Sequence, residues 1–207
     1  MSAGPVGVTL ADVLDLRAYE RARDDYRARI IELKRDRRVA LGPIMTLVFE
    51  SFDTVRFQVQ EMARAEKIIS DEGLQVELDI YNRLLPAPGE LSATLLIELT
   101  SEAELREWLP KLVGIETQLG VSVDGDVVRS VPEADHDAAL TREEVTPAVH
   151  YLRFPLLGSQ VEAFASAAEV ALVSEHPQYP ARTVLGPAVR EQLLGDLLGT
   201  TKPLPLG

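Results

Sequence analysis

The segment ELSATLLIELT, residues Glu90 to Thr100, has the clearest strand pattern in the chain, and the expected fold follows from it. Every second residue is apolar and falls on one face, which comprises Leu91, Ala93, Leu95, Ile97 and Leu99. The other face contains Leu96 together with the polar residues Ser92, Thr94 and Glu98. This alternation is typical of an antiparallel strand with one buried and one wetter face.

Further strand patterns lie on both sides of this segment. LGVSVDGDVVRSV (Leu119 to Val131) places Asp124-Gly125 between two alternating runs, which is the strongest short-range signal for a β-hairpin. Short apolar runs rich in branched and aromatic residues predict strands over residues 44–50, 149–156 and 168–176. The polar and acidic stretch 132–144 predicts an exposed loop.

Helical spacing dominates the first 85 residues. It predicts one long helix or two shorter ones over 10–38, stopped by Gly42-Pro43, and further helices over 52–69 and 75–85. Shorter helices are expected from the Ser101 capping box to Trp108, over SQVEAFASA (residues 159–167), and between Pro187 and Gly199. We therefore expect an α+β fold, with N-terminal helices packed on a mainly antiparallel sheet formed largely by the C-terminal half. Residues 10–198 are expected to form one domain between flexible tails at 1–9 and 199–207.

Composition limits the function. A formal net charge of −12 argues against a nucleic-acid partner, because nucleic-acid-binding domains usually carry a basic surface. The basic run RARIIELKRDRR (Arg27 to Arg38) indicates a solvated helix end or, as the less favoured alternative, a surface that docks an acidic partner. The chain has no cysteine, which excludes thiolate catalysis and cysteine-ligated clusters. Without a membrane-length apolar run or a signal peptide, we expect a cytoplasmic protein that does not enter a membrane.

Familiar catalytic motifs are absent from the sequence. It contains neither a glycine-rich phosphate-binding loop nor G-x-S-x-G, and it has only three histidines. His136 falls in the acidic loop, His150 on an apolar strand face, and His176 before a turn. No cofactor is indicated and no metal site is predicted. A mononuclear iron site built from Glu50, Glu61 and a distant histidine is kept as a weaker alternative.

The helix containing FQVQEMARAEKII (Phe57 to Ile69) has an unusual density of polar residues. Val59, Met62 and Ile69 continue one apolar stripe, which accounts for the helix itself. Its polar side chains, together with polar residues before and after this stretch, either form a solvated face or line a ligand pocket. The candidate pocket residues are Glu50, Arg56, Gln60, Glu61, Arg64, Tyr81 and Asn82. In such a pocket an arginine side chain could bind an anionic ligand group with two hydrogen bonds.

Three stretches resemble an uncharacterised bacterial family catalogued as domain of unknown function 3501. They are RRVALGPIMTLVFESFDTVRFQVQEMARAEKI (Arg37 to Ile68), ELDIYNRLLPAPGELSATLLIEL (Glu77 to Leu99) and HYLRFPL (His150 to Leu156). The likeness extends from about Leu10 to Leu198. Genes of that family commonly lie near rubrerythrin-like proteins and a cysteine-rich iron–sulfur oxidoreductase, so the resemblance implies a role in redox or peroxide metabolism. It assigns no role to any individual residue.

Two main hypotheses follow. The first is a non-catalytic accessory or interaction protein of a cytosolic redox or peroxide-defence system, with a redox-protein partner and self-association into a homo-oligomer. The second is a small-ligand-binding protein or enzyme that uses the seven candidate pocket residues. Non-haem iron binding is a third, weaker hypothesis.

Overall fold

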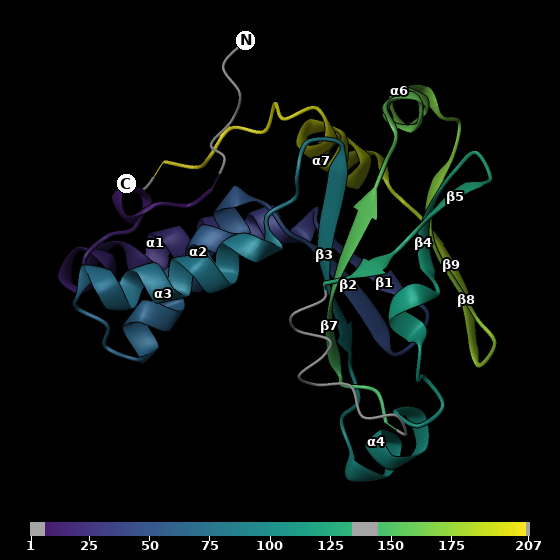
Figure 1. Cartoon of the computed structure of the whole chain (residues 1–207), viewed down its shortest axis with the longest axis horizontal. Coiled ribbons are helices and arrows are strands. Elements are labelled where there is room, and N and C mark those ends of the chain that lie inside the picture. Colours follow the sequence, from purple (N-terminus) through teal and green to yellow (C-terminus); the bar gives the residue numbers. More distant parts are fainter. Residues whose placement is uncertain (1–6, 134–144, 206–207) are drawn as a thin grey trace.

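The computed structural model describes residues 7–133 and 145–205, and its fold is α+β. A layer of three helices lies to one side of two antiparallel sheets (Figure 1). The helices of this layer are α1 (Leu16–Arg35), α2 (Phe52–Ala65) and α3 (Asp71–Tyr81), accompanied by the 3₁₀ helices η1 (Leu10–Asp12) and η2 (Asn82–Leu84).

The first sheet, sheet A, is centred on the strand from which the fold was predicted. Its order is β1 (Arg38–Leu41), β2 (Met45–Phe49), β3 (Glu90–Ile97), β7 (Val149–Pro155) and β6 (Val131–Pro132). In β3 the predicted apolar face is buried, with Leu91, Ala93 and Leu95 in the main core. Ser92 and Thr94 point to the opposite face, on the side where the helical layer packs.

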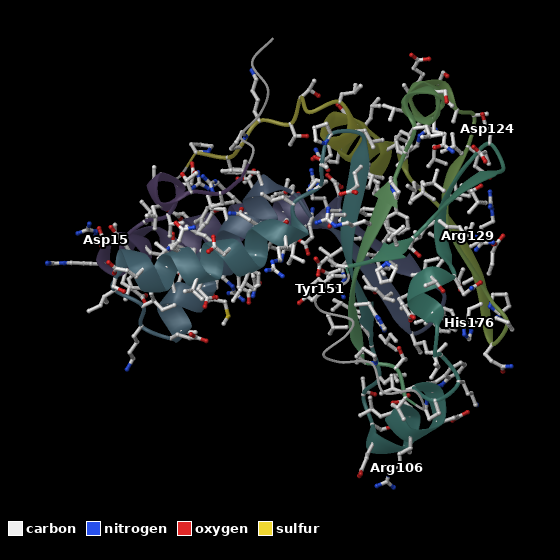
Figure 2. All side chains as sticks on the ribbon, in the orientation of Figure 1. Asp15, Arg106, Asp124, Arg129, Tyr151 and His176 are labelled. Carbon is white, nitrogen blue, oxygen red and sulfur yellow. The ribbon has the colours of Figure 1, made fainter. Side chains whose placement is uncertain are left out.

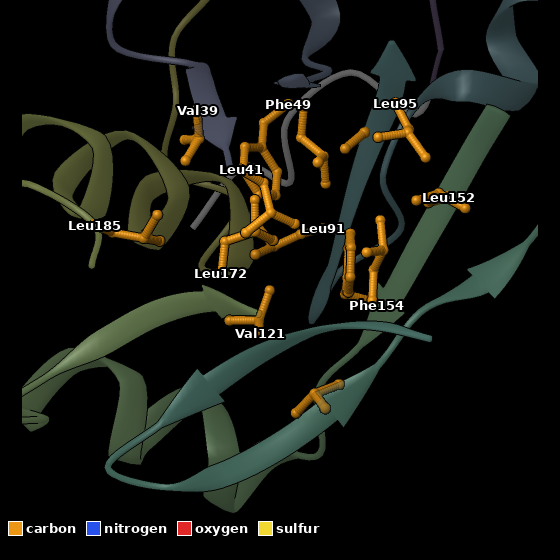
Figure 3. Packing of buried hydrophobic residues seen from close by; sticks show 14 of the residues in the cluster. Val39, Leu41, Phe49, Leu91, Leu95, Val121, Leu152, Phe154, Leu172 and Leu185 are labelled. Carbon is orange, nitrogen blue, oxygen red and sulfur yellow. The ribbon is translucent and has the colours of Figure 1, made fainter. Parts of the chain in front are cut away.

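The second sheet, sheet B, packs its apolar face against sheet A. Its order is β5 (Asp126–Arg129), β4 (Leu119–Val123), β8 (Val170–His176) and β9 (Tyr179–Val184). Side chains from both sheets interdigitate in the core, as Phe49, Leu91, Val121 and Leu172 show (Figure 3). Tyr179 links the sheets, since its hydroxyl donates to the Leu41 carbonyl at 2.7 Å and accepts from the Ile44 amide at 3.1 Å.

The other helices in the described part of the chain lie at the ends of the sheets (Figure 1). They are α4 (Glu102–Trp108), η3 (Ile115–Thr117), α6 (Gly158–Ser166) and α7 (Pro187–Leu197). Ser101 forms the predicted capping box with Glu104, and Pro187 begins α7 as expected. The predicted hairpin is also confirmed, because Asp124 and Gly125 both adopt positive φ angles, 47° and 98°, between β4 and β5.

Several element boundaries differ from the prediction. The first long helix ends at Arg35, and residues 38–41 form β1, so Gly42-Pro43 makes the turn of a hairpin and does not stop a helix. Strands β6 and β9 were also missed, and Pro177 lies in a hairpin turn between β8 and β9. Helix α2 ends at Ala65, so Ile69 is not part of its apolar stripe and is 89% exposed. The predicted loop residues 134–144 lie outside the described residues.

The described parts of the predicted flexible tails are packed against the helical layer. Val8 is only 2% exposed and belongs to a small core with Val55, Val59 and Leu78. The segment after α7 runs back to the helical layer (Figure 1), where Leu204 packs beside Tyr26 and Ile30. Both segments are held by contacts with distant residues, and the periodicity of the sequence does not indicate such contacts. Residues 1–6 and 206–207 lie outside the described residues.

Candidate functional site

Two of the seven predicted site residues hold the N-terminal segment in place. Gln60 is fully buried, and its side-chain amide makes two 2.9 Å hydrogen bonds with the backbone N–H and C=O of Leu14. Asn82 does the same with Val8, at 2.8 and 2.9 Å. Each side-chain amide therefore satisfies the N–H and C=O groups of one backbone residue outside the helices and strands, because buried peptide groups need hydrogen-bond partners.

Arg56 is buried in a second structural cluster. It donates to Asp53 at 2.7 Å, to the Tyr26 hydroxyl at 2.9 Å and to the Leu204 carbonyl at 2.6 Å. Asp53 also accepts from the Leu204 amide, at 3.0 and 3.1 Å. Burial raises the pKa of Asp53, although the Leu204 amide and Arg56 act in the opposite direction. This cluster attaches the C-terminal segment to α2.

Glu61 and Arg64 attach α2 to α1, with different degrees of exposure. Glu61 accepts two 2.8 Å hydrogen bonds from Arg23 and one of 2.6 Å from the Tyr19 hydroxyl. The Arg23 hydrogen bond lowers the pKa of Glu61, and burial, the next largest influence, opposes it. Arg64 donates to Glu20 at 2.6 Å in a more exposed pair. These residues were predicted to share a pocket, but each contacts α1.

Glu50 and Tyr81 are the two predicted residues that the structure brings toward one place, which we call the Glu50 corner: Glu50, Thr54, Tyr81, Thr94 and Tyr151. Glu50 follows β2 at the entry to α2, and its carboxylate accepts from Thr54 at 2.5 Å and from Thr94 at 2.6 Å. Thr94 is the register partner of Tyr151 on β7. Burial is the main cause of the raised pKa of Tyr151, and electrostatic interactions with Tyr81 and Glu50 add to it.

A second feature, missed by the sequence analysis, covers the outer surface of α3 and the turn before it. This α3 face consists of the exposed apolar residues Ile69, Val76 and Ile80 and the carboxylates Glu66, Glu72, Glu77 and Asp79. Val76 and Ile80 are 56% and 39% exposed and stand one helical turn apart. That four-residue spacing was visible in the sequence, but it could not be distinguished from the adjacent core spacing of Leu74 and Leu78.

Glu77 gives the α3 face an unusual electrostatic feature. Its side chain lies on the flank of α3 next to Ile80 and is only 8% exposed. No hydrogen bond or ion pair joins its carboxylate to another residue of the part described. Burial is the larger cause of the raised pKa of Glu77, and the nearby Glu66 carboxylate raises this pKa further.

The iron-site alternative receives no geometric support from its two carboxylates. Glu50 precedes α2, whereas Glu61 lies about 14 Å along the helix axis from Phe52, the first residue of α2, since a helix rises about 1.5 Å per residue. Within residues 7–133 and 145–205, no group of three or more His, Cys, Asp or Glu side chains is arranged to hold a metal ion. Both described histidines are buried and hydrogen-bonded. Nε2 of His176 lies 3.2 Å from the Val113 carbonyl oxygen, and Nε2 of His150 lies 3.0 Å from the Thr146 hydroxyl. His136 lies outside the described residues.

A shallow hollow of about 420 Å³ lies elsewhere, near the start of α7. It is lined by Ala168, Glu169, Val170, Val184, Leu185, Pro187 and Arg190. Arg190 donates to the carbonyls of Ala167 and Phe164, and Glu169 pairs with Arg182. Its charged side chains thus already have partners in the fold, and none of the predicted site residues lines it.

Comparisons with known proteins agree with the fold. A family model described as "Protein of unknown function (DUF3501)" matches residues 7–197. The chain is similar to a solved structure of a protein of unknown function from Burkholderia pseudomallei K96243, at 37% sequence identity and a TM-score of 0.85. The likeness covers 92% of this chain and 99% of that one. Among curated proteins, none matches. None of the helices in the described part of the chain has the length and apolarity needed to cross a membrane.

Proposed function

The chain belongs to the DUF3501 family of proteins of unknown function, and we propose that it is a non-catalytic interaction protein that docks a partner through the α3 face. The observation that carries this proposal is the exposure of Val76 and Ile80, one turn apart on the well-formed helix α3, and of Ile69 in the turn before it. Covering a Val or Ile side chain that is already partly buried contributes less than the about 1.5–3 kcal/mol of complete burial. Three such side chains together are enough to anchor an interface that polar contacts then orient.

The charge around these residues defines the partner. Glu72, Glu77 and Asp79 lie on the same helix as Val76 and Ile80, Glu66 lies near Glu77, and the whole chain has a net charge of −12. A complementary surface therefore carries lysine or arginine beside apolar residues. Opposite charges at the rim of an interface accelerate association and select among partners more than they add affinity.

The redox context comes from the family resemblance. Genes near those of the family encode rubrerythrin-like proteins and a cysteine-rich iron–sulfur oxidoreductase, and either is a suitable partner. Because this chain contains no cysteine, the iron–sulfur chemistry of such a complex would belong to the partner. The proposal includes a cytoplasmic location and self-association into a homo-oligomer, as expected from the sequence.

The experiment measures binding of the purified full chain to each purified neighbouring redox protein by biolayer interferometry. A Val76→Asp/Ile80→Asp variant should weaken binding by at least tenfold, whereas Ile31→Asp, which alters an exposed isoleucine on α1, should leave binding unchanged. Light scattering on the same samples measures self-association. Failure of the wild-type chain to bind either protein, or equal binding by the double variant, would reject docking through the α3 face.

A further inference from the structure

We propose that the Glu50 corner is a binding site for an organic cation, an ammonium or guanidinium group. The site is separate from the α3 face and does not depend on docking. The sequence suggested a ligand-binding role for Glu50 and Tyr81, and the structure adds three residues that the sequence did not indicate, Thr54, Thr94 and Tyr151.

The fold holds the Glu50 carboxylate in a defined orientation. Thr54 on α2 and Thr94 on β3 each donate a hydroxyl hydrogen bond to a different carboxylate oxygen, at 2.5 and 2.6 Å. The backbone amide of Ser51 donates a 2.8 Å hydrogen bond to the Thr54 hydroxyl and so fixes the position of this hydroxyl. A carboxylate has about four acceptor positions, so two remain available after these two bonds.

No cation neutralises this carboxylate within the described chain. The half-buried Glu50 side chain takes part in no ion pair there, in contrast to Glu61, which Arg23 binds with two hydrogen bonds. The Arg37 guanidinium donates to the Glu50 backbone carbonyl at 3.4 Å, and its ion pair is with Asp196. A partly desolvated carboxylate without a counter-ion gains from a cation that can donate to its free lone pairs.

Two phenol groups favour an organic cation at this site. Tyr81 and Tyr151 pack against the same small core of α2 and α3, and Tyr151, the register partner of Thr94, lies within electrostatic reach of both Tyr81 and Glu50. Aromatic ring faces attract ammonium and guanidinium groups. A divalent metal would instead require several oxygen ligands with more negative charge, and this corner supplies one carboxylate.

Most residues of the corner are partly exposed. Tyr151 is half-buried and is labelled at the junction between the helical layer and sheet A (Figure 2). Glu50, Tyr81 and Thr94 are likewise only partly buried. Side chains from α2, α3, β3 and β7 meet here, so the bound cation would contact both the helical layer and the sheet.

The test uses the isolated full-length protein and nuclear magnetic resonance titrations. Butylammonium and butylguanidinium chloride are the probes, and potassium chloride is the ionic-strength control. We expect saturable shifts of the Thr54 and Thr94 amide signals that potassium chloride does not produce. Glu50→Gln should weaken binding about tenfold or more, because the neutral amide removes the charge pairing. Tyr151→Leu should weaken it several-fold, and Glu162→Gln on the exposed surface of α6 should have no effect.

A further arm identifies the source of the cation. Tighter binding of Nα-acetyl-lysine amide than of butylammonium would assign the site to a lysine side chain of a protein, and the reverse order would assign it to a free amine. Equal affinities of wild type and Glu50→Gln, or shifts reproduced by potassium chloride, would overturn the proposal. Because no partner protein is present, this result stands apart from that of the docking experiment.

Discussion

At the scale of single residues, two carboxylates on neighbouring helices have opposite environments. Glu61 receives hydrogen bonds from Arg23 and Tyr19, which favour its ionised form and lower its pKa. Glu77 is more deeply buried, has no such donors, and lies near the Glu66 carboxylate, so its pKa is raised. At neutral pH the ionised glutamate side chain therefore stabilises the fold at position 61 and destabilises it at position 77.

Replacing Glu77 with glutamine should stabilise the protein by about 1 kcal/mol at pH 7, because the variant no longer buries an unpaired charge. The folded-state pKa of Glu77 is raised, so the folded chain retains this proton more strongly than the unfolded chain. The associated stability is present at low pH and is lost as the pH rises through the folded-state pKa. Urea unfolding at pH 5 and pH 7 should therefore show a smaller difference between variant and wild type at pH 5.

The exposed Glu72, one turn before Val76, provides the control for this prediction. Glu72→Gln should change the free energy of unfolding by less than about 0.5 kcal/mol at either pH. If Glu77→Gln were less stable than the wild type at pH 7, the Glu77 carboxylate would have a stabilising partner and the prediction would be wrong.

The ion pair between Arg37 and Asp196 is buried, so removing one of its partners should strongly destabilise the protein. Arg37 is fully buried, and its guanidinium donates to both Asp196 oxygens, at 2.6 and 2.9 Å. Asp196→Asn should cost about 3–5 kcal/mol in urea unfolding, because it leaves a buried arginine without its counter-ion. Arg35→Ala, which breaks an exposed pair with Glu32, should cost less than about 1 kcal/mol. Similar losses in the two variants would contradict the importance of burial.

At the scale of elements, local sequence signals performed best where an element's own residues satisfy its backbone. The hairpin at Asp124-Gly125, the capping box at Ser101 and the alternation in β3 are all confirmed. Strands β1 and β6 were missed because they contain only four and two residues, and β9 because its internal Pro180 weakens the strand pattern. Such short segments become strands through pairing with β2, β7 and β8, and that pairing is not encoded in a local period.

The turn between β4 and β5 should be sensitive to the loss of glycine. Gly125 has a φ of 98°, a conformation that side chains rarely adopt, and a Cβ atom there would meet no other atom. Gly125→Ala should therefore cost about 1–2 kcal/mol through backbone strain alone. Thermal unfolding measures this change.

Gly158 at the start of α6 is the matched control, since it also has open space around a Cβ atom but no positive φ. Gly158→Ala should be neutral or slightly stabilising, because alanine favours helix. Equal destabilisation by both substitutions would show that the φ angle of Gly125 is not the cause.

At the scale of the whole molecule, the C-terminal segment connects sheets and helices. Arg37 and Asp196 join the start of β1 to α7, and the chain then continues to Leu204, which binds Asp53 and Arg56 on α2. The segment predicted as a flexible tail is thus a structural link, at least through residue 205. The helical layer depends on it to satisfy two buried charged side chains.

Removing residues 203–207 should destabilise the protein by about 2–3 kcal/mol, since Asp53 loses two backbone donations and Arg56 loses one acceptor. Leu204→Ala keeps the backbone and removes only part of one side chain, so it should cost less than the truncation. Urea unfolding of both variants measures the difference. A truncated protein as stable as the wild type would show that the buried pair is satisfied without this segment.

The candidate site was only partly predictable. Polar residues on α2 suggested a pocket, but side chains one turn apart on a helix point in different directions and meet different elements. Gln60 meets Leu14, Glu61 meets Arg23, and Arg56 meets Leu204. Glu50 and Tyr81 lie at the same corner, and their assignment to ligand binding remains a prediction.

The sequence by itself determined the α+β class, the central strand, the hairpin turn and most helices, because these depend on periodicity and local backbone chemistry. Only the tertiary structure decided that Arg37 pairs with Asp196, that the C-terminal segment packs on α2, and that Thr94 and Tyr151 flank Glu50. Each of these contacts joins residues more than 40 positions apart. Their formation depends on strand pairing and helix packing over the whole chain, and no local pattern records which distant side chain meets a buried polar group.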